Sequence, residues 1–245
     1  MEGYDAATYG DRIADVYDEL YPPGPGVDDV VALLADLAAG GAVLELGVGT
    51  GRLALPLAAR GVNVTGVDAS ARIVEKLRAK PGGERLEVRL ADFGRDPLGK
   101  DFALVFVAFN TFFGLTDQSS QVACFVNVAA ALAPGGRFVM EAFVPDLGRF
   151  DRGQRTDTTA IAAHQITINS AIHDSVSQRV ESMHTIVRPD GIAMYPVVIR
   201  YAWPAELDLM AQLAGLEPEH RWGGWGRPPF TANSNQHVSV WRKPA

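Results

Sequence analysis

The stretch AVLELGVGTGR, from Ala42 to Arg52, decides the fold because an apolar run in it leads directly into a turn with glycine at every second position. Residues 43–46 have the length and composition of a short buried strand, and the pattern over 52–60 predicts a helix. The glycines between them are Gly47, Gly49 and Gly51. Glycine at such a turn lets a ligand approach the backbone more closely than a Cβ would permit.

Strands and helices alternate on both sides of this stretch. The predicted strands are 43–46, 62–67, 86–90, 102–109, 137–143 and 237–241. The predicted helices are 27–37, 52–60, 71–78, 121–132 and one that begins at Trp203-Pro204 and ends at Gly215. This alternation favours right-handed crossovers and a doubly wound, mostly parallel α/β sheet. A ligand site is therefore expected at the carboxyl ends of the strands, just after Leu46, Val67, Leu90 and Phe109.

The pattern changes to a period of two from about Asp157 to Trp203, which predicts a small antiparallel β insertion after the fifth strand. Within it, VRPDGIAM has the proline and glycine of a turn between antiparallel strands. The expected organisation is a helical lid (1–40), a core (41–150), the β insertion (151–203) and a C-terminal part of the core (204–245). An appended sheet has to cover a face, so we expect a homo-oligomer, a dimer or larger, that forms through it. The alternative is that it roofs the pocket of a monomer.

Composition restricts the class of protein. The 245 residues are 47% hydrophobic and 21% charged, which is typical of a folded globular chain. A net charge of -7 argues against a nucleic-acid partner. The longest apolar run, 102–109, is far shorter than the roughly 20 residues of a membrane span, and the acidic start lacks signal-peptide features. We therefore expect a cytoplasmic protein without a membrane partner. A single cysteine, Cys124, excludes an intramolecular disulfide and a multi-cysteine metal site.

The spacing of the glycines separates two cofactor classes. The dinucleotide fingerprint G-x-G-x-x-G requires a third glycine where this chain has Arg52. The pattern here, E-x-G-x-G-x-G, resembles instead the first motif of the class I S-adenosylmethionine-dependent methyltransferases. The resemblance covers about residues 40–145 and implies a seven-stranded sheet, S-adenosylmethionine as cofactor and S-adenosylhomocysteine as product. It places the methionine and ribose of the cofactor against the glycine turn. The alternative is a tight turn that only packs helix on strand.

Two carboxylates fall where the same family has its other cofactor contacts. Asp68, after the second strand, would accept hydrogen bonds from both ribose hydroxyls; as an alternative it caps the helix that starts near Ala71. Asp92, after the third strand, would accept from the adenine amine with Phe93 beside the ring, and the alternative is a solvated loop aspartate. The implied cofactor-binding set is Glu45, Gly47, Val48, Gly49, Gly51, Arg52, Asp68, Ala69, Ala91, Asp92, Phe93 and Phe109.

The segment after the fourth strand bears on the acceptor. Asn110 is followed by Thr111, Phe112 and Phe113, without the prolines of the N-P-P-Y-like motif that methylases of exocyclic amines share. No acidic residue stands here before Asp117, so no catalytic metal is expected. We expect Asn110, Phe112 and Phe113 to form an aromatic wall facing the methyl group. Phe112 and Phe113 could equally be core residues.

The N-terminal segment YDAATYGDRIADVYDELYP, residues 4–22, resembles the lid of small-molecule N-methyltransferases. Tyr9 and Tyr17 are about two helical turns apart, which would place them on one face of a helix; both could also simply pack the helix. The whole layout is similar to bacterial amino-sugar and antibiotic N-methyltransferases, the lincosamide type included.

The resemblance implies a small-molecule amine substrate, a natural product whose amino group is methylated. Tyr9, Tyr17 and Asn110 are the candidates for orienting the amine, with Glu141 as acid or base. A histidine base is the alternative for Glu141. O- or C-methylation, and a protein that binds S-adenosylmethionine without transferring methyl, remain open as functions.

Overall fold

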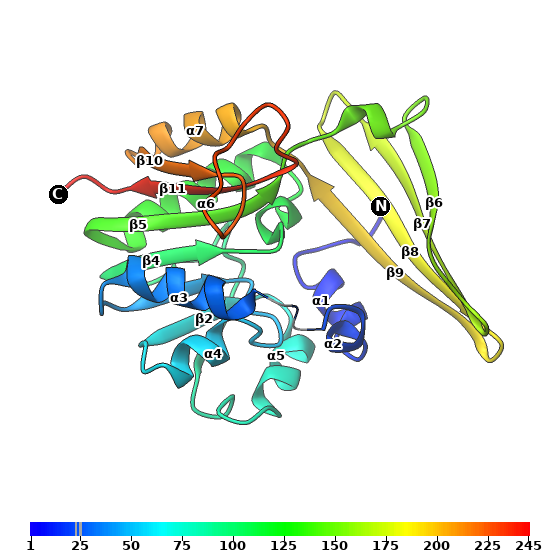
Figure 1. The fold of residues 1–245 in the computed structure, drawn as a ribbon, viewed down its shortest axis with the longest axis horizontal. Coiled ribbons are helices and arrows are strands. Elements are labelled where there is room, and N and C mark those ends of the chain that lie inside the picture. Colours follow the sequence, from blue (N-terminus) through cyan, green and yellow to red (C-terminus); the bar gives the residue numbers. More distant parts are fainter. Residues whose placement is uncertain (23, 25) are drawn as a thin grey trace.

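The computed structural model describes residues 1–22, 24 and 26–245. A seven-stranded sheet with helices on both faces forms the core, and a separate four-stranded sheet stands beside it (Figure 1). The core strands are β1 (Val43–Leu46), β2 (Val64–Asp68), β3 (Glu87–Leu90), β4 (Phe102–Val107), β5 (Leu132–Phe143), β10 (Glu217–Trp222) and β11 (Gln236–Arg242). Their order across the sheet is β10-β11-β5-β4-β1-β2-β3. This is the doubly wound, mostly parallel sheet that the sequence predicts.

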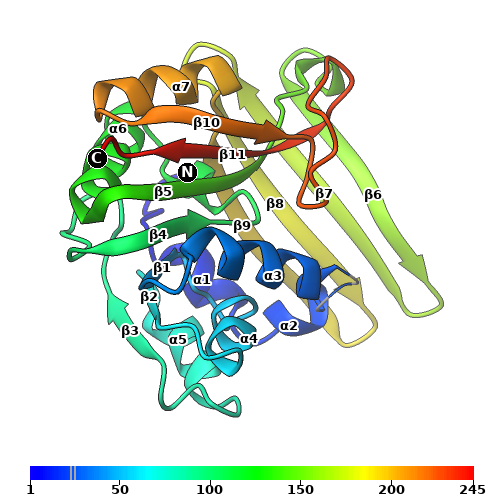
Figure 2. The same cartoon turned by 60° about the vertical axis from the view of Figure 1, so that its left-hand side comes forward.

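The helices that connect the parallel strands cover both faces of the sheet and bury it. β1 to β5 pair in parallel, while β11 runs antiparallel to both β5 and β10. The core helices are α3 (Val27–Ala38), α4 (Ala54–Ala59), α5 (Ala71–Arg78), α6 (Gln118–Ala131) and α7 (Pro204–Leu213). In β4, Leu104 and Phe106 pack in the cluster with α3 and α4, whereas Val105 and Val107 pack in the cluster with α6 and α7. A parallel strand covered on both faces has to be continuously apolar, as β4 is. Figure 2 shows α3 lying over the strands.

Most predicted elements are confirmed, and the differences have local causes. Strand β10 was not predicted, because EPEHRW carries neither an apolar run nor a clean alternation. Helix α6 begins three residues earlier than expected, since the carboxylate of Asp117 accepts from the backbone N–H of Ser120 at 2.8 Å and caps it. Among the described residues, no helix combines the length and the apolar character that crossing a bilayer requires.

The β insertion is an antiparallel meander whose strands are longer than expected. It consists of β6 (Gln154–Ala162), β7 (Gln165–Asp174), β8 (Arg179–Arg188) and β9 (Gly191–Arg200), in that order. The turn predicted in VRPDGIAM does join β8 to β9. Ile172 on β7 and Ile192 on β9 are 66% exposed and mark the face that points away from the core. Self-association through the insertion remains a prediction.

The N-terminal segment lies between the core and the insertion. It forms α1 (Thr8–Ile13) and α2 (Tyr17–Leu20), which are separate short helices instead of the single helix expected. Gly10 of α1 lies so close to Ser70 that an added Cβ would stand 2.5 Å from the Ser70 Cβ. Next to it, the Ser70 hydroxyl donates to the Asp11 carboxylate at 2.6 Å. The lid is therefore packed directly on the start of α5.

A buried polar cluster joins the insertion to the core. Arg200, at the end of β9, is only 4% exposed, and its guanidinium lies 2.7 Å from the Glu206 carboxylate on α7. It also donates to Gln178, which in turn donates to Glu206 at 2.9 Å. Gln121 of α6 donates to the Arg200 backbone carbonyl at 2.7 Å. A buried guanidinium needs these partners, so the cluster holds the end of β9 against α6 and α7.

Replacing Glu206 with glutamine tests this cluster. We expect Glu206→Gln to lower the free energy of unfolding by about 1–2 kcal/mol at neutral pH, since Arg200 loses its charged partner but keeps hydrogen bonds. Burial raises the pKa of Glu206, but hydrogen bonds from Gln178, Arg200 and Gln118 outweigh it and leave the pKa below its ordinary value. A lowered pKa stabilises the folded state above the unfolded pKa, so the difference should shrink as pH falls through the folded pKa.

Chemical denaturation of both proteins between pH 7 and acid pH measures this difference. The matched control is Glu19→Gln, which removes the ion pair between Glu19 and Arg188. The Glu19 side chain is 66% exposed. The control should change stability by less than about 0.5 kcal/mol. An equal effect from both substitutions would contradict the role of the buried cluster.

Candidate active site

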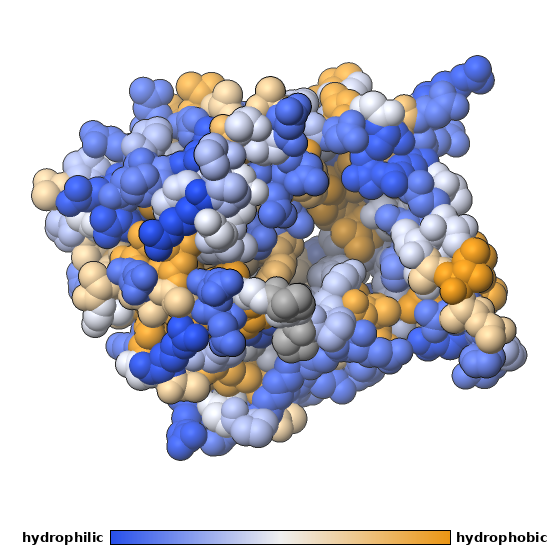
Figure 3. All heavy atoms as spheres, viewed as in Figure 1, coloured by the Kyte–Doolittle hydropathy of each residue, from blue (hydrophilic) through white to orange (hydrophobic). Residues whose placement is uncertain are grey.

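A cavity of about 250 Å³ opens at the carboxyl ends of β1, β2 and β4, where the sequence predicted a ligand site. The glycine turn, the segment after β4, the N-terminal lid and β9 form its walls. In the space-filling view a recess opens between the core and the insertion (Figure 3). Of the predicted residues, those that line the cavity are Tyr9, Tyr17, Gly47, Gly49, Asp68, Ala69, Asp92, Phe93, Phe109 and Asn110.

The three glycines of the turn serve different purposes. All have positive φ, which glycine adopts without strain. A Cβ on Gly49 would meet no atom closer than 3.9 Å, so its bare backbone faces open space in the cavity. A Cβ on Gly47 would collide with the Thr111 methyl, and one on Gly51 would stand 2.8 Å from Leu55. Gly51 does not line the cavity, and packing against Leu55 already requires glycine there, so a cofactor contact at Gly51 stays a prediction.

Backbone N–H groups hold the carboxylate of Asp68 at the edge of the cavity. It accepts from the N–H of Gly49 and from the N–H of Ser70, both at 2.9 Å. Burial raises the pKa of Asp68, and these backbone hydrogen bonds oppose the rise. The cap of α5 is Ser70, whose hydroxyl accepts from Ile73, so the capping alternative for Asp68 is wrong. Its remaining lone pairs are positioned to accept from ligand hydroxyls beside Gly49.

Asp92 stands at the boundary with an adjoining cavity of about 460 Å³. Ala69 and Asp92 line both cavities, and Ala91 lines the second. The Asp92 carboxylate accepts from the Gly94 N–H at 2.9 Å, which fixes its orientation. The two cavities together give room for an elongated ligand that passes from the glycine turn over Asp68 to Asp92. This donor and acceptor set fits a nucleoside with an amino-acid tail, as the resemblance implies.

The segment after β4 adopts a strained turn that the sequence did not predict. Phe109 and Asn110 both have positive φ, at 54° and 62°, which is unfavourable for side chains with a Cβ. Two hydrogen bonds from β5 hold the turn. The Glu141 carboxylate accepts from the Phe109 N–H at 2.9 Å, and the Asn110 side-chain carbonyl accepts from the Phe143 N–H at 2.7 Å. Phe109, 38% exposed, consequently presents its ring to the cavity.

Arg52 and Glu45 lie behind this turn and do not line the cavity. The Arg52 guanidinium sits 4.2 Å from the centroid of the Phe109 ring, a cation–π contact that supports it from behind. Glu45 is 5% exposed, and burial raises its pKa well above the ordinary value. Glu45 Oε2 and Arg52 Nε have no partner among the described residues. Val48, 3% exposed, belongs to the core. Of these three residues, Arg52 contacts the cavity through the Phe109 ring.

Three expectations for the acceptor side need correction. Phe112 and Phe113 are fully buried in the core cluster of α6 and α7, so they do not form a wall of the cavity. The cause is the 3₁₀ turn Thr111–Gly114, which rotates both rings inward after the strained turn. Glu141 uses its carboxylate to hold the Phe109 backbone and does not line the cavity. It is a positioning residue here, not the acid or base that the sequence suggested.

Tyr9 and Tyr17 meet in the cavity although they lie on different helices. The chain turns between α1 and α2, and both side chains line the cavity together with Phe109. Burial raises the pKa of Tyr9, and it raises the pKa of Tyr17 to about 12 although the positive charge of Arg52 opposes the rise. Both phenols are neutral at physiological pH. They can donate or accept a hydrogen bond without changing charge.

The remaining cavity residues were missed by the sequence analysis. Tyr4 and Asp5 precede the lid helices, and Thr111 follows Asn110. The stretch 197–199 of β9 adds a wall from the insertion, which supports the roofing alternative for this sheet. Nothing in the alternating pattern of β9 marks these residues as a ligand wall, because only the packing of the insertion brings them there. Groups of three potential metal-ligating side chains are absent from the described residues.

Comparison with known proteins agrees with this geometry. A family model described as a methyltransferase domain matches residues 43–136. The solved structure of the CcbJ methyltransferase from Streptomyces caelestis is 41% identical and superposes with a TM-score of 0.92 over 99% of this chain and 100% of that one. The cypemycin N-terminal methyltransferase of a Streptomyces species is 28% identical over 96% of this chain and 98% of its own length.

A more distant structure shares the fold. CalS10, an amino pentose methyltransferase from Micromonospora echinaspora, is 21% identical with a TM-score of 0.67, covering 93% of this chain and 96% of that one. The open backbone at Gly49, the acceptor atoms of Asp68 and the full-length match to CcbJ lead to one assignment. The chain belongs to the S-adenosylmethionine-dependent methyltransferases, with S-adenosylmethionine as its cofactor.

Proposed function

We propose that this enzyme methylates an amino group of a small molecule, an amino sugar or an antibiotic intermediate. The observation that carries the proposal is the pair of neutral phenols, Tyr9 and Tyr17, which face the acceptor side of the cavity beside Phe109. A neutral amine carries its own lone pair and one or more N–H groups. Phenol oxygens accept hydrogen bonds from such N–H groups and thereby direct the lone pair.

For methyl transfer to an amine, the protein mainly has to bind and orient the two reactants. When bound, S-adenosylmethionine supplies a methyl group on a positively charged sulfur. The residues of the cavity would hold the acceptor nitrogen beside that methyl group and exclude water. The lid and β9 cover the cavity on the sides away from the core sheet, which serves both purposes. The amine has to arrive unprotonated, because an ammonium ion has no lone pair to donate.

Amine methylation is favoured over O-methylation by the titratable groups that face the cavity. An alcohol would have to lose its proton as it attacks, so a base must stand beside it. Of the lining carboxylates, Asp68 and Asp92 are assigned above to the cofactor, and Asp5 accepts three hydrogen bonds from its own loop, at Ala7 and Thr8. The phenols hold their protons. None of these side chains is arranged as a base toward an alcohol.

The names of relatives support the same class. The cypemycin enzyme is described as methylating an N-terminus, which is an amine acceptor. CcbJ, whose fold matches along the whole chain, is described only as a methyltransferase and adds no atom preference. The sugar and antibiotic context comes from more distant structures such as CalS10. Amine acceptors of this kind are therefore the first to test.

The direct experiment is incubation of the purified protein with S-adenosylmethionine and a panel of amino-sugar, aminoglycoside and lincosamide-type amines. Formation of S-adenosylhomocysteine together with a mass gain of one methylene group on the amine, located by fragmentation, would establish the function. Methyl transfer to oxygen or carbon in the same panel would contradict it. Binding of S-adenosylmethionine without transfer to any acceptor would favour a non-transferring role.

Removing either phenol hydroxyl should lower kcat and leave the affinity for the cofactor unchanged. We expect Tyr9→Phe and Tyr17→Phe each to lower kcat by about tenfold or more, because one hydrogen bond to the acceptor is lost while the ring packing remains. Steady-state kinetics on an acceptor found in the panel, with calorimetric titration of S-adenosylhomocysteine, separates the two effects. Tyr195→Phe is the matched control, since Tyr195 packs against the same hydrophobic cluster as Tyr9 and Tyr17 but does not line the cavity. A parallel loss of cofactor affinity would contradict the assignment.

Asp68 provides the test of the cofactor site. We expect Asp68→Asn to weaken S-adenosylhomocysteine binding by about 10- to 100-fold, because an amide offers fewer acceptor lone pairs and no charge. Isothermal titration calorimetry measures this directly. Asp36→Asn changes an exposed aspartate of α3 in the same chemical way and should leave the affinity unchanged. Equal affinity of wild type and Asp68→Asn would mean that the ribose hydroxyls are held elsewhere.

A further inference from the structure

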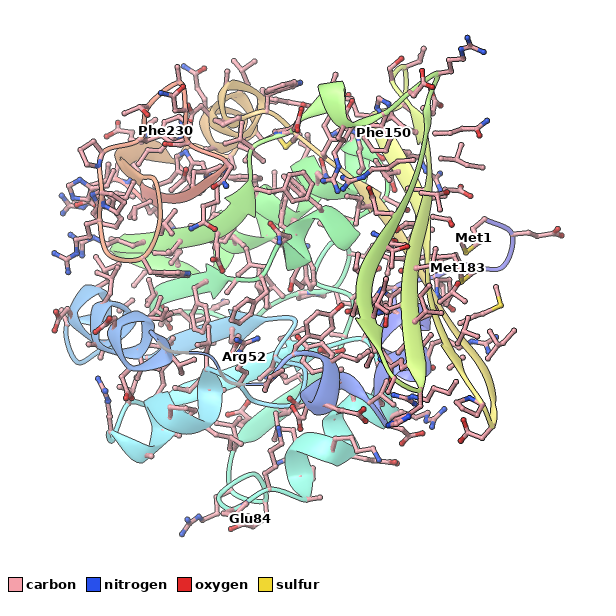
Figure 4. All side chains as sticks on the ribbon, turned by 45° about the vertical axis from the view of Figure 1, so that its right-hand side comes forward. Met1, Arg52, Glu84, Phe150, Met183 and Phe230 are labelled. Carbon is pink, nitrogen blue, oxygen red and sulfur yellow. The ribbon has the colours of Figure 1, made fainter. Side chains whose placement is uncertain are left out.

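A separate cavity of about 180 Å³ lies on the face of the insertion that looks toward the core, at the end where β6 begins. One wall comes from the chain that follows β5, residues 143–150, which includes the short 3₁₀ helix η2 (Leu147–Arg149). The opposite wall is the sheet itself, with side chains from all four strands. Figure 4 labels Phe150 where the chain enters the insertion and Arg52 on the core side. The proposed function does not use this cavity.

The strand register connects this cavity to the active site. Val197 lines the first cavity and pairs directly with Ser182 on β8. Ser182 pairs with Ala171 on β7, and Ala171 pairs with Arg155 on β6. Directly paired residues of an antiparallel sheet project from the same face, so these four side chains form one row. Since strands are about 4.8 Å apart, the row spans about 14 Å. Its last three members line the distal cavity.

A second row of directly paired residues also connects the two cavities. Ile199 of β9 lines both cavities, and it pairs with Val180, which lines the distal one. Between the two cavities, the Phe143 N–H donates to Asn110, so a residue of the distal wall is bonded to a residue of the active site. The two cavities therefore adjoin each other along this face of the sheet.

The distal cavity is lined by as many basic as acidic side chains. It contains the basic side chains of Arg149 and Arg155 and the acidic side chains of Asp146 and Asp157. Arg155 and Asp157 form an ion pair with each other, so neither is a lone charge seeking a counter-ion. The amide of Asn169 adds donors and an acceptor, whereas the Ser182 hydroxyl donates to the Val197 backbone carbonyl at 3.2 Å and offers acceptor lone pairs. Groups that both donate and accept, such as neutral hydroxyls, match this lining better than a carboxylate or a phosphate.

An aromatic surface completes the cavity. The ring of Phe150 stacks on His173 with centroids 4.6 Å apart, and His173 Nε2 lies 3.0 Å from the Tyr201 hydroxyl. Phe150 and Tyr201 both line the cavity. Aromatic rings beside planar polar side chains suit a ligand that has an apolar face and a rim of hydroxyls. A saturated sugar ring has this character.

We propose that the acceptor lies along the Val197–Arg155 row, with its amine at the phenols of the first cavity and a neutral, hydroxyl-rich, sugar-like part in the distal cavity. Arg155, Asp157 and Asn169 bind the hydroxyls there. The proposal rests on the amine methylation proposed above and narrows it to acceptors whose amine and polyol are joined by a linker that reaches from the phenols past Val197 into the distal cavity.

Three amines test the proposal: 6-aminohexyl β-D-glucopyranoside, 6-aminohexyl phosphate and hexylamine. They share the same primary amine and six-carbon chain and differ only in the distal group. We expect the glucoside to be preferred over hexylamine by about tenfold in kcat/KM, the gain of one or two hydrogen bonds. In Ala171→Trp, which fills the middle of the distal cavity, the ratio of the two kcat/KM values should fall to near unity. A preference for the phosphate, or an unchanged ratio in Ala171→Trp, would overturn the proposal.

The adjacent residue provides a matched control. Ile172 lies on the opposite face of β7 and is 66% exposed, so Ile172→Trp should keep the wild-type preference. The same three amines are also titrated into the protein loaded with S-adenosylhomocysteine. If none of them is methylated, amine methylation fails for these probes, but extra affinity for the glucoside that Ala171→Trp removes would still establish the distal site. Equal affinity for all three amines in wild type would refute it.

Discussion

The close approach of three strand ends is the constraint on which the active site depends. The backbone after β1 must pass between the carboxylate after β2 and the turn after β4. Glycine makes this possible: the Gly49 N–H reaches Asp68 at 2.9 Å, and Gly47 leaves room for the Thr111 methyl. A side chain at either position would push these segments apart or project into the ligand space. The cofactor cavity is the volume that remains once the three segments are packed.

Glu141 and Arg52 do not line the cavity, but both contact Phe109, which does. The strained backbone of Phe109 and Asn110 persists because β5 supplies a carboxylate and an N–H to hold it. Strain of this kind costs about 1–3 kcal/mol per residue and is retained where the surroundings enforce it. The result is an aromatic ring presented to the acceptor and supported from behind by Arg52. Glu141 and Arg52 thus contribute to the site through Phe109.

The insertion has two faces with different roles. The face toward the core carries the wall of the first cavity and all of the strand residues of the distal one. The outward face carries exposed isoleucines on β7 and β9. The Arg200 cluster keeps the inward face in position, because it ties the end of β9 to α6 and α7 through buried polar contacts. An antiparallel sheet appended to a complete core in this way adds walls to the two cavities without contributing to the glycine turn.

The sequence by itself determined most of the core sheet, the insertion and the places of Gly47, Gly49, Asp68 and Asp92 at the strand ends. Apolar runs, glycine spacing and the acidic residues after Val67 and Ala91 are local signals, and parallel strands bring their carboxyl ends together whatever the rest of the chain does. Only the tertiary structure decided the acceptor side. The inward rotation of Phe112 and Phe113, the positioning role of Glu141 and the wall from β9 depend on contacts between segments far apart in the chain. No local pattern encodes such contacts, because they follow from how the lid and the insertion pack on the finished core.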